Sequence, residues 1–552
     1  MSLTIAPNDL KFVIFASGHD YTLADSGNGD VQIFSHPFVP LNSVNYAGQY
    51  YFLVPDEDGN PIDAVKDDIV HCTFTPALGT AFSTEGEATV ECHYHREYVY
   101  DEETLVVDKT VSQKITVVNH GSVSQSNTYC DLYSDGYLFY RPQSVNAVNN
   151  NMWLVGTGSP TKLSSIPWRV QKLGNGIYGF CDGSNLSDIS ELQYADTSHV
   201  VEMSRLLVGG RYITNAKVKE AIGGWNVENL QTLTYSFNNT AITDLTFLEK
   251  WNTPNLVTLD FEGMTNLVTA HGAEHLNVSK VTSFKNLFFT CIKLADISAV
   301  ANWNTEKVQT LEGAFNRNEQ LVDISPLTSW NVTALKNMQG VFEGCSKLAS
   351  LEPLGSWSPV LTSINTAFKG CVALKNLKGL EHFDVSGVTS LKDMCNGCTG
   401  IKSLTGVEGW NVGNVSNFDS AFNDLHFITN ILPLKDWDMH SATNIDTMFG
   451  SNGFLQNVDG VIWNMPNLTT HGGAFTGHKL WYSSIIDKVI YEAWWYYYDI
   501  DGNAYGGSAV YDTEHPLVQV WKDASEAENW TVGGTNLGTF NNVEWNNLPS
   551  WN

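Results

Sequence analysis

Cationic side chains are scarce in this chain of 552 residues, and charged residues of either sign make up only 16% of it. The 30 lysines and arginines are outnumbered by 59 aspartates and glutamates, which gives a formal net charge of -29. Because phosphate backbones and anionic lipid surfaces repel such a protein, we expect neither nucleic acid nor a membrane surface as its partner.

Long apolar runs are also missing. No stretch approaches the roughly 18 consecutive apolar residues of a membrane-spanning helix, so no membrane insertion is expected. The opening segment MSLTIAPNDLKFVIFASGHDY lacks the basic and apolar regions of a secretory signal peptide. We therefore expect a chain made without ordinary export, which stays in the cytoplasm, leaves by another route or is released by lysis as part of a virus particle.

Disulfide frameworks and catalytic motifs are not apparent. The nine cysteines are odd in number, so they cannot all pair within one chain, and we expect most to be reduced and packed as small apolar groups. No G-x-S-x-G, P-loop, H-E-x-x-H or Rossmann pattern occurs. A pair of carboxylates for glycoside hydrolysis stays open, because any cleft could supply one. We expect no enzyme activity and no cofactor.

The densest set of metal-ligand types is His71, Cys72, Cys92, His93 and His95. Zinc needs four such ligands converging on one point. On a strand, His93 and His95 would share a face while Cys92 points away, so the favoured interpretation is one buried cysteine and two exposed histidines. No metal site is predicted.

Cys395 and Cys398 form a C-x-x-C pair, a pattern that can bind metals or carry redox chemistry. Cys398 falls in step with Cys345 and Cys371, however, so core packing is the favoured interpretation. The segments 56–60 and 499–503 resemble the opening of a calcium loop but lack its glycine and final glutamate, and tight turns are expected there.

What the sequence does contain is a repeat. Aromatics are plentiful at 12%, and one recurs every 25 to 27 residues, usually followed by Asn or Asp, with Leu276 filling one gap. The members of this first ladder are Trp225, Trp251, Trp303, Trp330, Trp357, Phe383, Trp410, Trp437 and Trp463.

Two further ladders keep step with the first. About twelve residues after each member comes a second aromatic, and a third position follows it with cysteine, asparagine or histidine. The second ladder comprises Phe237, Phe289, Phe315, Phe342, Phe368, Phe422, Phe449 and Phe475, with Cys395 in one repeat and Phe261 or Met264 in another; the third comprises Cys345, Cys371, Cys398, Asn318, Asn452 and His478.

A unit of 26 or 27 residues is too short to bury its own apolar face. Stacked copies would place each tryptophan on the previous one and so build a continuous core. The Asn or Asp after most of these aromatics favours a turn, because its side chain can bond nearby backbone.

The unit W-N-V-x-x-[VL]-x-x-[LM]-x-x-x-F-x-x-C-x-x-L-x-x-[LI]-x-x-L resembles the BspA-like class of leucine-rich repeats. It is most similar to the 26-residue surface-protein repeats of mycoplasmas, lactobacilli and gut bacteria, and of phages that infect such hosts. The resemblance covers residues 221–480. It implies a right-handed solenoid, surface exposure and adhesion or recognition, with no catalytic residues.

The expected fold is mainly β, in four parts. Alternating apolar strands over residues 1–121, with segment 82–121 resembling immunoglobulin-like accessory domains of phage virion proteins, predict a β-sandwich that docks the chain. A second β-rich or mixed domain covers residues 122–220, with a helix expected at 196–208. A solenoid of about ten coils follows at 221–480, and then a C-terminal cap or tip at 481–552.

The C-terminal part carries a dense aromatic cluster of Trp494, Trp495, Tyr496, Tyr497 and Tyr498. A cap that closes the end of the solenoid is favoured. The alternative is a site that contacts a ligand or partner, because exposed aromatics stack on sugars and anchor proteins.

The function expected is that of a non-enzymatic structural or recognition protein. The favoured hypothesis is a phage virion appendage, attached to other virion proteins by its N-terminal domain and binding a host-surface protein or glycan from the virion surface. Homo-oligomers are compatible with it. The alternatives are a bacterial cell-surface or secreted adhesin of the BspA-like type, and a carbohydrate-active enzyme that carries repeats.

Overall fold

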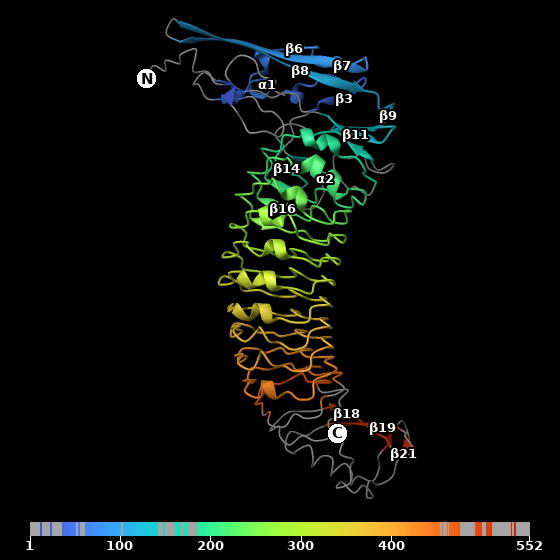
Figure 1. Cartoon of the computed structure of the whole chain (residues 1–552), viewed down its shortest axis with the longest axis vertical. Coiled ribbons are helices and arrows are strands. Elements are labelled where there is room, and N and C mark those ends of the chain that lie inside the picture. The colour runs from blue at the N-terminus through green and yellow to red at the C-terminus, as the bar shows by residue number, and fades with distance from the viewer. Residues whose placement is uncertain are drawn as a thin grey trace. The chain divides into compact units, whose positions relative to one another are not determined.

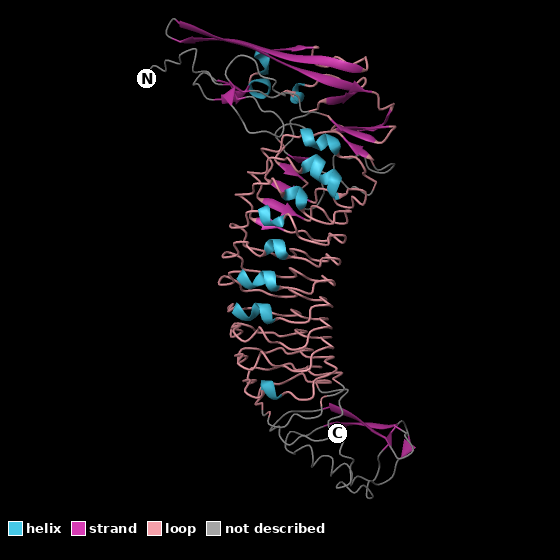
Figure 2. Ribbon diagram, viewed as in Figure 1, coloured by secondary structure: helices cyan, strands magenta, loops and turns pink. Residues whose placement is uncertain are grey.

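The structure is a computed structural model. It describes residues 36–50, 53–55, 61–100, 103–141, 160–166, 170–174, 185–452, 455, 461 and 463–474, and the backbone of short strands at 12–13, 23–24, 147–148, 492–498, 504–510, 531–532 and 535–536. Strand and loop dominate, with few short helices, so the expectation of a mainly β chain is confirmed (Figure 2). The chain divides into two compact units, Met1–Val281 and Thr282–Asn552. The four-part division of the sequence stays a prediction.

The first unit contains a four-stranded sheet in the order β3-β8-β7-β6. Its centre is a long hairpin in which β7 pairs with β8 along its whole length, from Gly86↔Val117 to Tyr100↔Glu103. Alternate residues of β7, among them Val90, Cys92 and Tyr94, are fully buried, which is the period of two expected of a strand with one face on a core. The strands are β3 (Phe38–Pro40), β6 (Cys72–Thr75), β7 (Gly86–Tyr100) and β8 (Glu103–Val118).

Shorter elements accompany this sheet. In α1, the carboxylate of Asp63 caps the helix by accepting from the backbone N–H groups of Val65 and Lys66. The antiparallel pair β4–β5 flanks the predicted turn at 56–60, which itself lies outside the described residues. An immunoglobulin-like sandwich stays a prediction. The elements are β1 (Phe12–Val13), β2 (Leu23–Ala24), η1 (Ala47–Gln49), β4 (Leu53–Pro55), β5 (Pro61–Asp63), α1 (Ala64–Asp67) and η2 (Ile69–His71).

A second four-stranded sheet of the first unit has the order β13-β11-β10-β9. All four residues of β11 are buried, so this strand is covered on both faces. The strands are β9 (Val123–Ser126), β10 (Cys130–Tyr133), β11 (Tyr137–Tyr140) and β13 (Lys162–Leu163).

The first unit ends in stacked coils whose strands pair in parallel, in the order β12-β14-β15-β16-β17. Partners are 30 residues apart from β14 to β15 and from β15 to β16, then 26 apart from β16 to β17. One turn of chain therefore separates neighbours. The elements are β12 (Ala147–Val148), β14 (Lys172–Leu173), η4 (Ser190–Tyr194), β15 (Glu202–Ser204), α2 (Asn215–Ile222), β16 (Thr232–Thr234), η5 (Thr246–Leu248), β17 (Thr258–Leu259) and η6 (Ala273–His275).

The helix expected at residues 196–208 is wrong. This segment forms β15 and the turns around it, and the helix lies later, at α2. Val200, Met203 and Leu206 are fully buried. Their three-residue spacing resembles the period of a helix, but it is the inward spacing of a coil, and Leu230 and Leu233 repeat it in the next coil.

The second unit consists of further stacked coils, drawn from yellow to orange in Figure 1. Single parallel β-bridges join equivalent residues of neighbouring coils, as in Thr310↔Asn337 and Asn417↔Asn444. Tight turns replace most regular strands. The remaining elements are η7 (Ser298–Val300), η8 (Ser325–Ser329), η9 (Glu352–Ser356), η10 (Leu432–Leu434), β18 (Glu492–Tyr498), β19 (Ala504–Val510), β20 (Thr531–Val532) and β21 (Thr535–Asn536).

Aromatic rings stack along the coils of the second unit. The ring of Trp330 lies 6.4 Å from those of both Trp303 and Trp357, nearly parallel to each. Trp410 and Trp437 stack at the same distance. Such ring pairs add stabilisation beyond the apolar area that they bury.

The tryptophans also bond the backbone of the preceding coil. In each case the indole Nε1–H donates to a buried carbonyl oxygen 29 to 33 residues earlier, over 2.8–3.0 Å. A phenylalanine could stack but could not donate this bond. The tryptophans concerned are Trp225, Trp251, Trp330, Trp357, Trp410, Trp437 and Trp463.

Turns follow these aromatics as the sequence predicts. The Asn or Asp side chain accepts from the backbone N–H two residues later, at 2.9–3.2 Å, and so closes an Asx turn. These residues are Asn226, Asn277, Asn304, Asn331, Asp384, Asn411 and Asp438.

The second ladder needs one correction. Phe288, not Phe289, is the fully buried member, and its ring stacks on that of Phe315. Phe315 in turn stacks on Phe342, and Phe342 on Phe368. The two adjacent phenylalanines are one residue apart in register, and only Phe288 keeps the spacing of 27 to Phe315. Further along, Phe422 stacks on Phe449, while Phe475 lies outside the described residues.

Candidate functional site

The β-bridged side of the second unit presents recurring polar side chains. Hydroxyls of Thr362, Thr443 and Thr469 donate to the carbonyl oxygen of the preceding coil, at 2.9–3.2 Å. A neighbouring column carries ion pairs between coils, such as Lys392 with Asp419 at 2.7 Å, and this hydrogen bond raises the pKa of Lys392. The arrangement offers hydrogen-bonding groups at a regular spacing.

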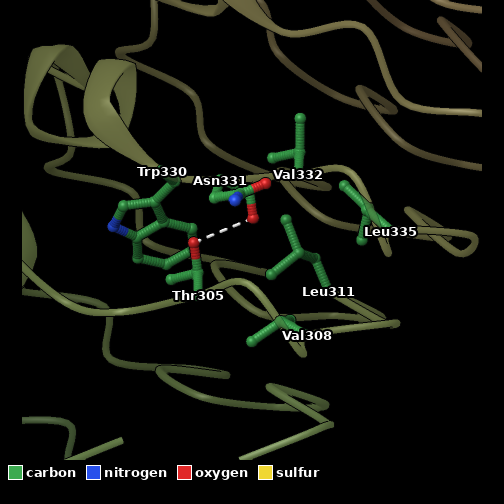
Figure 3. Close-up of a pocket in the computed structure, with 7 residues that line it drawn as sticks. All are labelled: Thr305, Val308, Leu311, Trp330, Asn331, Val332 and Leu335. Atoms are coloured by element: carbon green, nitrogen blue, oxygen red, sulfur yellow. Dashed lines mark hydrogen bonds between the residues drawn. The ribbon is translucent and has the colours of Figure 1, made fainter. Parts of the chain in front are cut away.

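A small recess lies between two coils of the second unit (Figure 3). It is lined chiefly by apolar side chains and is too narrow to hold even a water molecule. Pockets that enclose a small molecule usually measure about 300–1,000 Å³, so the recess does not fit such a ligand. Its lining residues are Thr305, Val308, Leu311, Trp330, Asn331, Val332 and Leu335.

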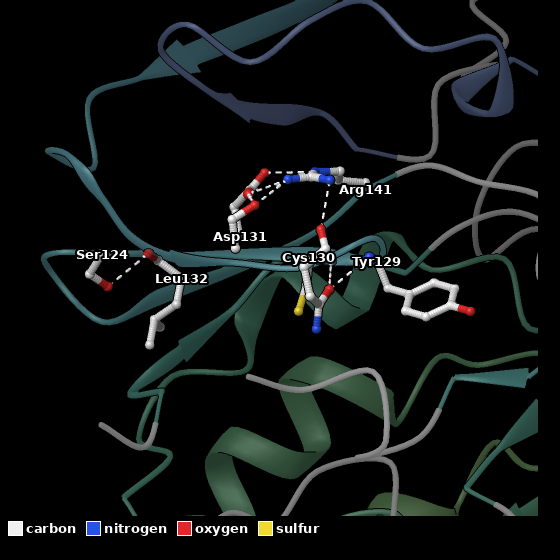
Figure 4. Close-up of polar contacts among 8 residues, drawn as sticks. Ser124, Tyr129, Cys130, Asp131, Leu132 and Arg141 are labelled. Atoms are coloured by element: carbon white, nitrogen blue, oxygen red, sulfur yellow. Dashed lines mark hydrogen bonds and ion pairs between the residues drawn. The ribbon is translucent and has the colours of Figure 1, made fainter. Parts of the chain in front are cut away.

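In the first unit, an arginine–carboxylate pair ties β9, β10 and the end of β11 together (Figure 4). Arg141 donates through Nε and Nη2 to the two carboxylate oxygens of Asp131, at 2.9 and 2.5 Å, and through Nη1 to the carbonyl of Asn127 at 2.7 Å. The bond to Asp131 raises the pKa of Arg141. Because each charge is neutralised by the other, we interpret this cluster as a structural contact that holds the sheet together and not as a binding site.

A second polar cluster of the first unit links β11 to η4. The hydroxyl of Tyr137 donates to Glu191 at 2.9 Å, and the Tyr137 ring stacks on His120 with centroids 3.8 Å apart. His120 bonds Asp135 at 2.9 Å. Burial raises the pKa of Glu191 to about 8, so this carboxyl group is protonated in the folded chain at neutral pH.

The five residues weighed as zinc ligands separate onto two faces. Cys92 is fully buried, and the ring of His71 lies 6.2 Å from that of Tyr94, which is buried as well. His93 and His95 lie on the exposed face, as predicted from strand alternation. The structure therefore does not bring these cysteines and histidines to one point.

The exposed histidines instead meet a residue that sequence reasoning missed. Asp108, on β8, accepts from His93 Nε2 at 2.7 Å and from His95 Nδ1 at 3.2 Å. These two bonds, His93 first, lower the pKa of Asp108. The register of the hairpin places Asp108 opposite His95.

The thiols of the repeats lie in the core. Cys395 and Cys398 are fully buried, and burial raises the pKa of Cys395 well above its usual range. Cys398 donates to the carbonyl of Phe368 at 2.9 Å, as Cys345 and Cys371 do to earlier coils. Thiols held in this way are unreactive. The described cysteines with free thiols include Cys72, Cys92, Cys345, Cys371, Cys395 and Cys398.

The remaining candidates from the sequence lie wholly or partly outside the described residues. Residues 494–498 lie on β18, which pairs antiparallel with β19, but their side chains lie outside the described residues. Segment 499–503 is outside them altogether, as is His478. Among the residues that the structure describes, no helix has the length and apolar character needed to cross a membrane.

Three segments of the chain match a protein family described as "Mycoplasma protein of unknown function, DUF285", at residues 176–264, 259–376 and 362–487. No curated protein matches the chain. The three matches follow one another through the stacked coils of both units, begin before the predicted start of the repeats at residue 221, and together span more than half of the sequence. The chain therefore belongs to the DUF285 family, whose repeats it carries from residue 176 to residue 487.

Proposed function

We propose that this chain is a non-enzymatic surface protein whose coils form a leucine-rich-repeat-like solenoid of the BspA type that binds a partner through its exposed polar face. One observation carries the proposal: equivalent residues of successive coils are joined by parallel bridges. The same surface position therefore recurs at a fixed interval, about the 4.8 Å that separates hydrogen-bonded strands. Such a periodic surface suits an extended macromolecular partner.

The interior of the coils supports binding over catalysis. Leucine, phenylalanine, tryptophan and cysteine fill it, and the buried amide of Asn452 donates to a backbone carbonyl of the preceding coil. The chemistry of the described coils is thus used to hold the stack together. A carbohydrate-active enzyme, the third hypothesis, would need a cleft with paired carboxylates.

For the biological setting, we propose a phage virion appendage. The N-terminal sheets would dock to other virion proteins, and the repeats would meet a protein or glycan of the host surface. The order of sheets and then repeats along the chain supports this arrangement, and membership in a family of surface-type repeats is compatible with it. A bacterial cell-surface adhesin is the competing proposal.

The binding face is tested with paired substitutions. Gln339 is exposed two residues after the bridged Asn337, and Glu352 is exposed on η9, in a different part of the same repeat. We expect Gln339→Arg to weaken binding on a glycan array or to host cells at least tenfold, and Glu352→Arg to leave it unchanged. Equal effects of the two substitutions would contradict the assignment of the face.

The setting is tested with antibodies raised against the whole chain. Gold label on purified phage particles would support the virion proposal, whereas label on bacterial cells alone would favour the adhesin. A reducing-sugar assay on any glycan that binds separates recognition from hydrolysis, and turnover would overturn the non-enzymatic proposal.

A further inference from the structure

We propose that His93, His95 and Asp108 form a binding site for a divalent transition-metal ion, with Zn²⁺ as its reference ligand, on the exposed face of the β7–β8 hairpin. The three side chains offer ligand atoms that all lie within 4.8 Å of one another. Two imidazoles and a carboxylate are a donor set that suits zinc and its neighbours in the first transition series.

The hairpin register creates the site. His93 and His95 are two residues apart on β7, so both point to the same face, and Asp108 lies directly opposite His95 on β8. The carboxylate thus sits between the two rings, whose centroids are 6.3 Å apart. Fifteen paired positions hold this hairpin, so the ligands rest on a regular backbone rather than on a loop.

The distances suit an ion with only small side-chain movements. Ligands of a tetrahedral zinc lie roughly 3.3 Å from one another, given bonds of about 2.0–2.1 Å. Here His93 Nε2 is 2.7 Å and His95 Nδ1 is 3.2 Å from the oxygens of Asp108. An ion would replace the bridging protons, and rotations of these partly exposed side chains would bring the three ligand atoms, which already lie within 4.8 Å of one another, to that spacing.

A neighbouring carboxylate supports the orientation of one ligand. Glu97 follows His95 by two residues on the same face, and its Oε1 lies 3.9 Å from His95 Nε2. A negative charge there favours a proton on Nε2 once an ion has replaced the proton that Nδ1 donates to Asp108. Outer carboxylates play this role at many zinc-bound histidines.

Access is open. The side chains of His93, His95 and Asp108 are 41%, 47% and 57% exposed, so an ion can enter from solvent and three protein ligands leave room for a water or a group from a partner. Cys92 lies on the opposite, buried face. The site is therefore distinct from a cysteine-based zinc centre.

The test uses the full chain, stripped with chelator and then dialysed against ZnCl₂, with bound zinc counted by mass spectrometry and affinity measured against a chromophoric chelator. We expect the wild type to retain an ion that His93→Gln, His95→Gln and Asp108→Asn each weaken at least tenfold. Glu97→Gln should weaken it less, by a few fold.

His440→Gln is the matched control. His440 also bonds a carboxylate, that of Asp438, at 2.9 Å, and the two side chains are similarly exposed at 55% and 63%, but no second histidine joins that group among the described residues. We expect this variant to bind zinc like the wild type. Because every substituted side chain is exposed, thermal melts should coincide and show that folding is unaffected.

Zinc X-ray absorption provides a second readout, expected to show imidazole and oxygen ligands only. Sulfur at the zinc–thiolate distance of about 2.3 Å would overturn the proposal. So would a wild type that retains no zinc above the dialysis buffer, an affinity unchanged by His93→Gln, or an equal loss in His440→Gln.

Discussion

The buried side chains that join neighbouring segments differ between the repeats of the second unit and the sheets of residues 36–141. In the repeats, neutral groups donate to backbone carbonyls of the preceding coil: an indole at Trp357, a thiol at Cys345 and an amide at Asn452. In the sheets, single charged pairs link the strands, such as Arg141 with Asp131.

The difference has a physical basis. A neutral donor that bonds the preceding coil can be copied at every turn, because it adds no charge and each coil meets only its neighbours. A buried charge needs an opposite charge beside it. The same charge repeated at every coil would bring like charges close together, so this kind of contact is not copied from coil to coil. We therefore expect the repeats to be modular and insensitive to pH, and the sheets to depend on individual groups and on pH.

The largest effect is expected from Trp330→Ala. This side chain stacks on two tryptophans and bonds the carbonyl of Val300 at 2.9 Å, so its loss removes contacts with both neighbouring coils. We expect the free energy of unfolding to fall by about 4 kcal/mol in urea titrations followed by circular dichroism. Trp330→Phe, which keeps a ring but not the donor, should cost about 1 kcal/mol. A loss of less than about 1 kcal/mol in the Trp330→Ala variant would contradict a stacked, modular core.

The dependence on pH is sharpest at Glu191, which lies on η4 at the start of the coils and accepts a hydrogen bond from Tyr137 of the sheets. Its pKa rises from 4.5 to about 8 on folding, so with increasing pH the unfolded chain loses this proton before the folded chain does. The free energy of unfolding that the protonated group contributes is therefore fully present below pH 4.5 and is lost as the pH rises to about 8. Glu191→Gln cannot ionise. We expect the variant to match the wild type in acid and to exceed it by about 3 kcal/mol above pH 8, which is less than the full shift implies because solvent reaches part of the group. Parallel stability curves for the two proteins would exclude a buried, protonated Glu191.

Backbone geometry in the repeats is tested by Gly406→Ala. Gly406 has a φ of +112°, and an added Cβ would collide with the carbonyl of Leu377 in the preceding coil. We expect a loss of about 2–3 kcal/mol, since the rigid backbone cannot yield. Gly409 has open space around it, so Gly409→Ala is the matched control and should change stability by less than about 0.5 kcal/mol in the same melts.

Single charged pairs are tested by Asp68→Asn. Asp68 accepts from both Arg96 and Tyr94 at 2.6 Å, and the Asp68 and Arg96 side chains are only 9% and 19% exposed. Neutralising the carboxylate leaves a partly buried guanidinium without its counter-charge, for an expected loss of about 2 kcal/mol. The control is Glu87→Gln, whose partner Lys114 is as exposed as Glu87 itself at 73%, and it should cost under about 0.5 kcal/mol.

The same contrast explains which features could be predicted from sequence. The ladders were visible because each position is sampled many times, and strands in the first 121 residues could be expected because apolar residues alternate there, as they do along β7. The coil at 196–208 was mistaken for a helix, since one copy of a three-residue spacing does not distinguish the two.

Single-copy features were beyond the sequence. The partner of His95 could not be named, because finding Asp108 requires the register of the hairpin, and a shift of one residue would place Asp108 on the other face. Left-handed backbone at Arg317 and Thr366 was equally hidden, since neither residue type favours it and only the equivalent Gly344 and Gly340 suggest the position.

The smallest effect, and the only gain, is expected where the first ladder lacks its donor. Phe383 occupies a tryptophan position and is 4% exposed, but its side chain has no N–H to donate. In the coils just before Phe383, the carbonyl of Leu327 accepts two hydrogen bonds, from the backbone N–H of Trp330 at 3.0 Å and from the indole N–H of Trp357 at 3.0 Å. The carbonyl of Leu354, one coil later, accepts the backbone N–H of Trp357 at 2.8 Å and precedes position 383 by 29 residues, which is within the spacing of the indole bonds in the other coils.

We therefore expect Phe383→Trp to raise the free energy of unfolding by about 1 kcal/mol, the net contribution of one hydrogen bond, in the same urea titrations. The reverse change, Trp357→Phe, should lower it by a similar amount, because it removes the equivalent bond and keeps the stacked ring. A loss in Phe383→Trp would mean that this coil has closed around the smaller ring, so that the added volume strains the core. The repeats would then be individually fitted, as the sheets are, rather than interchangeable.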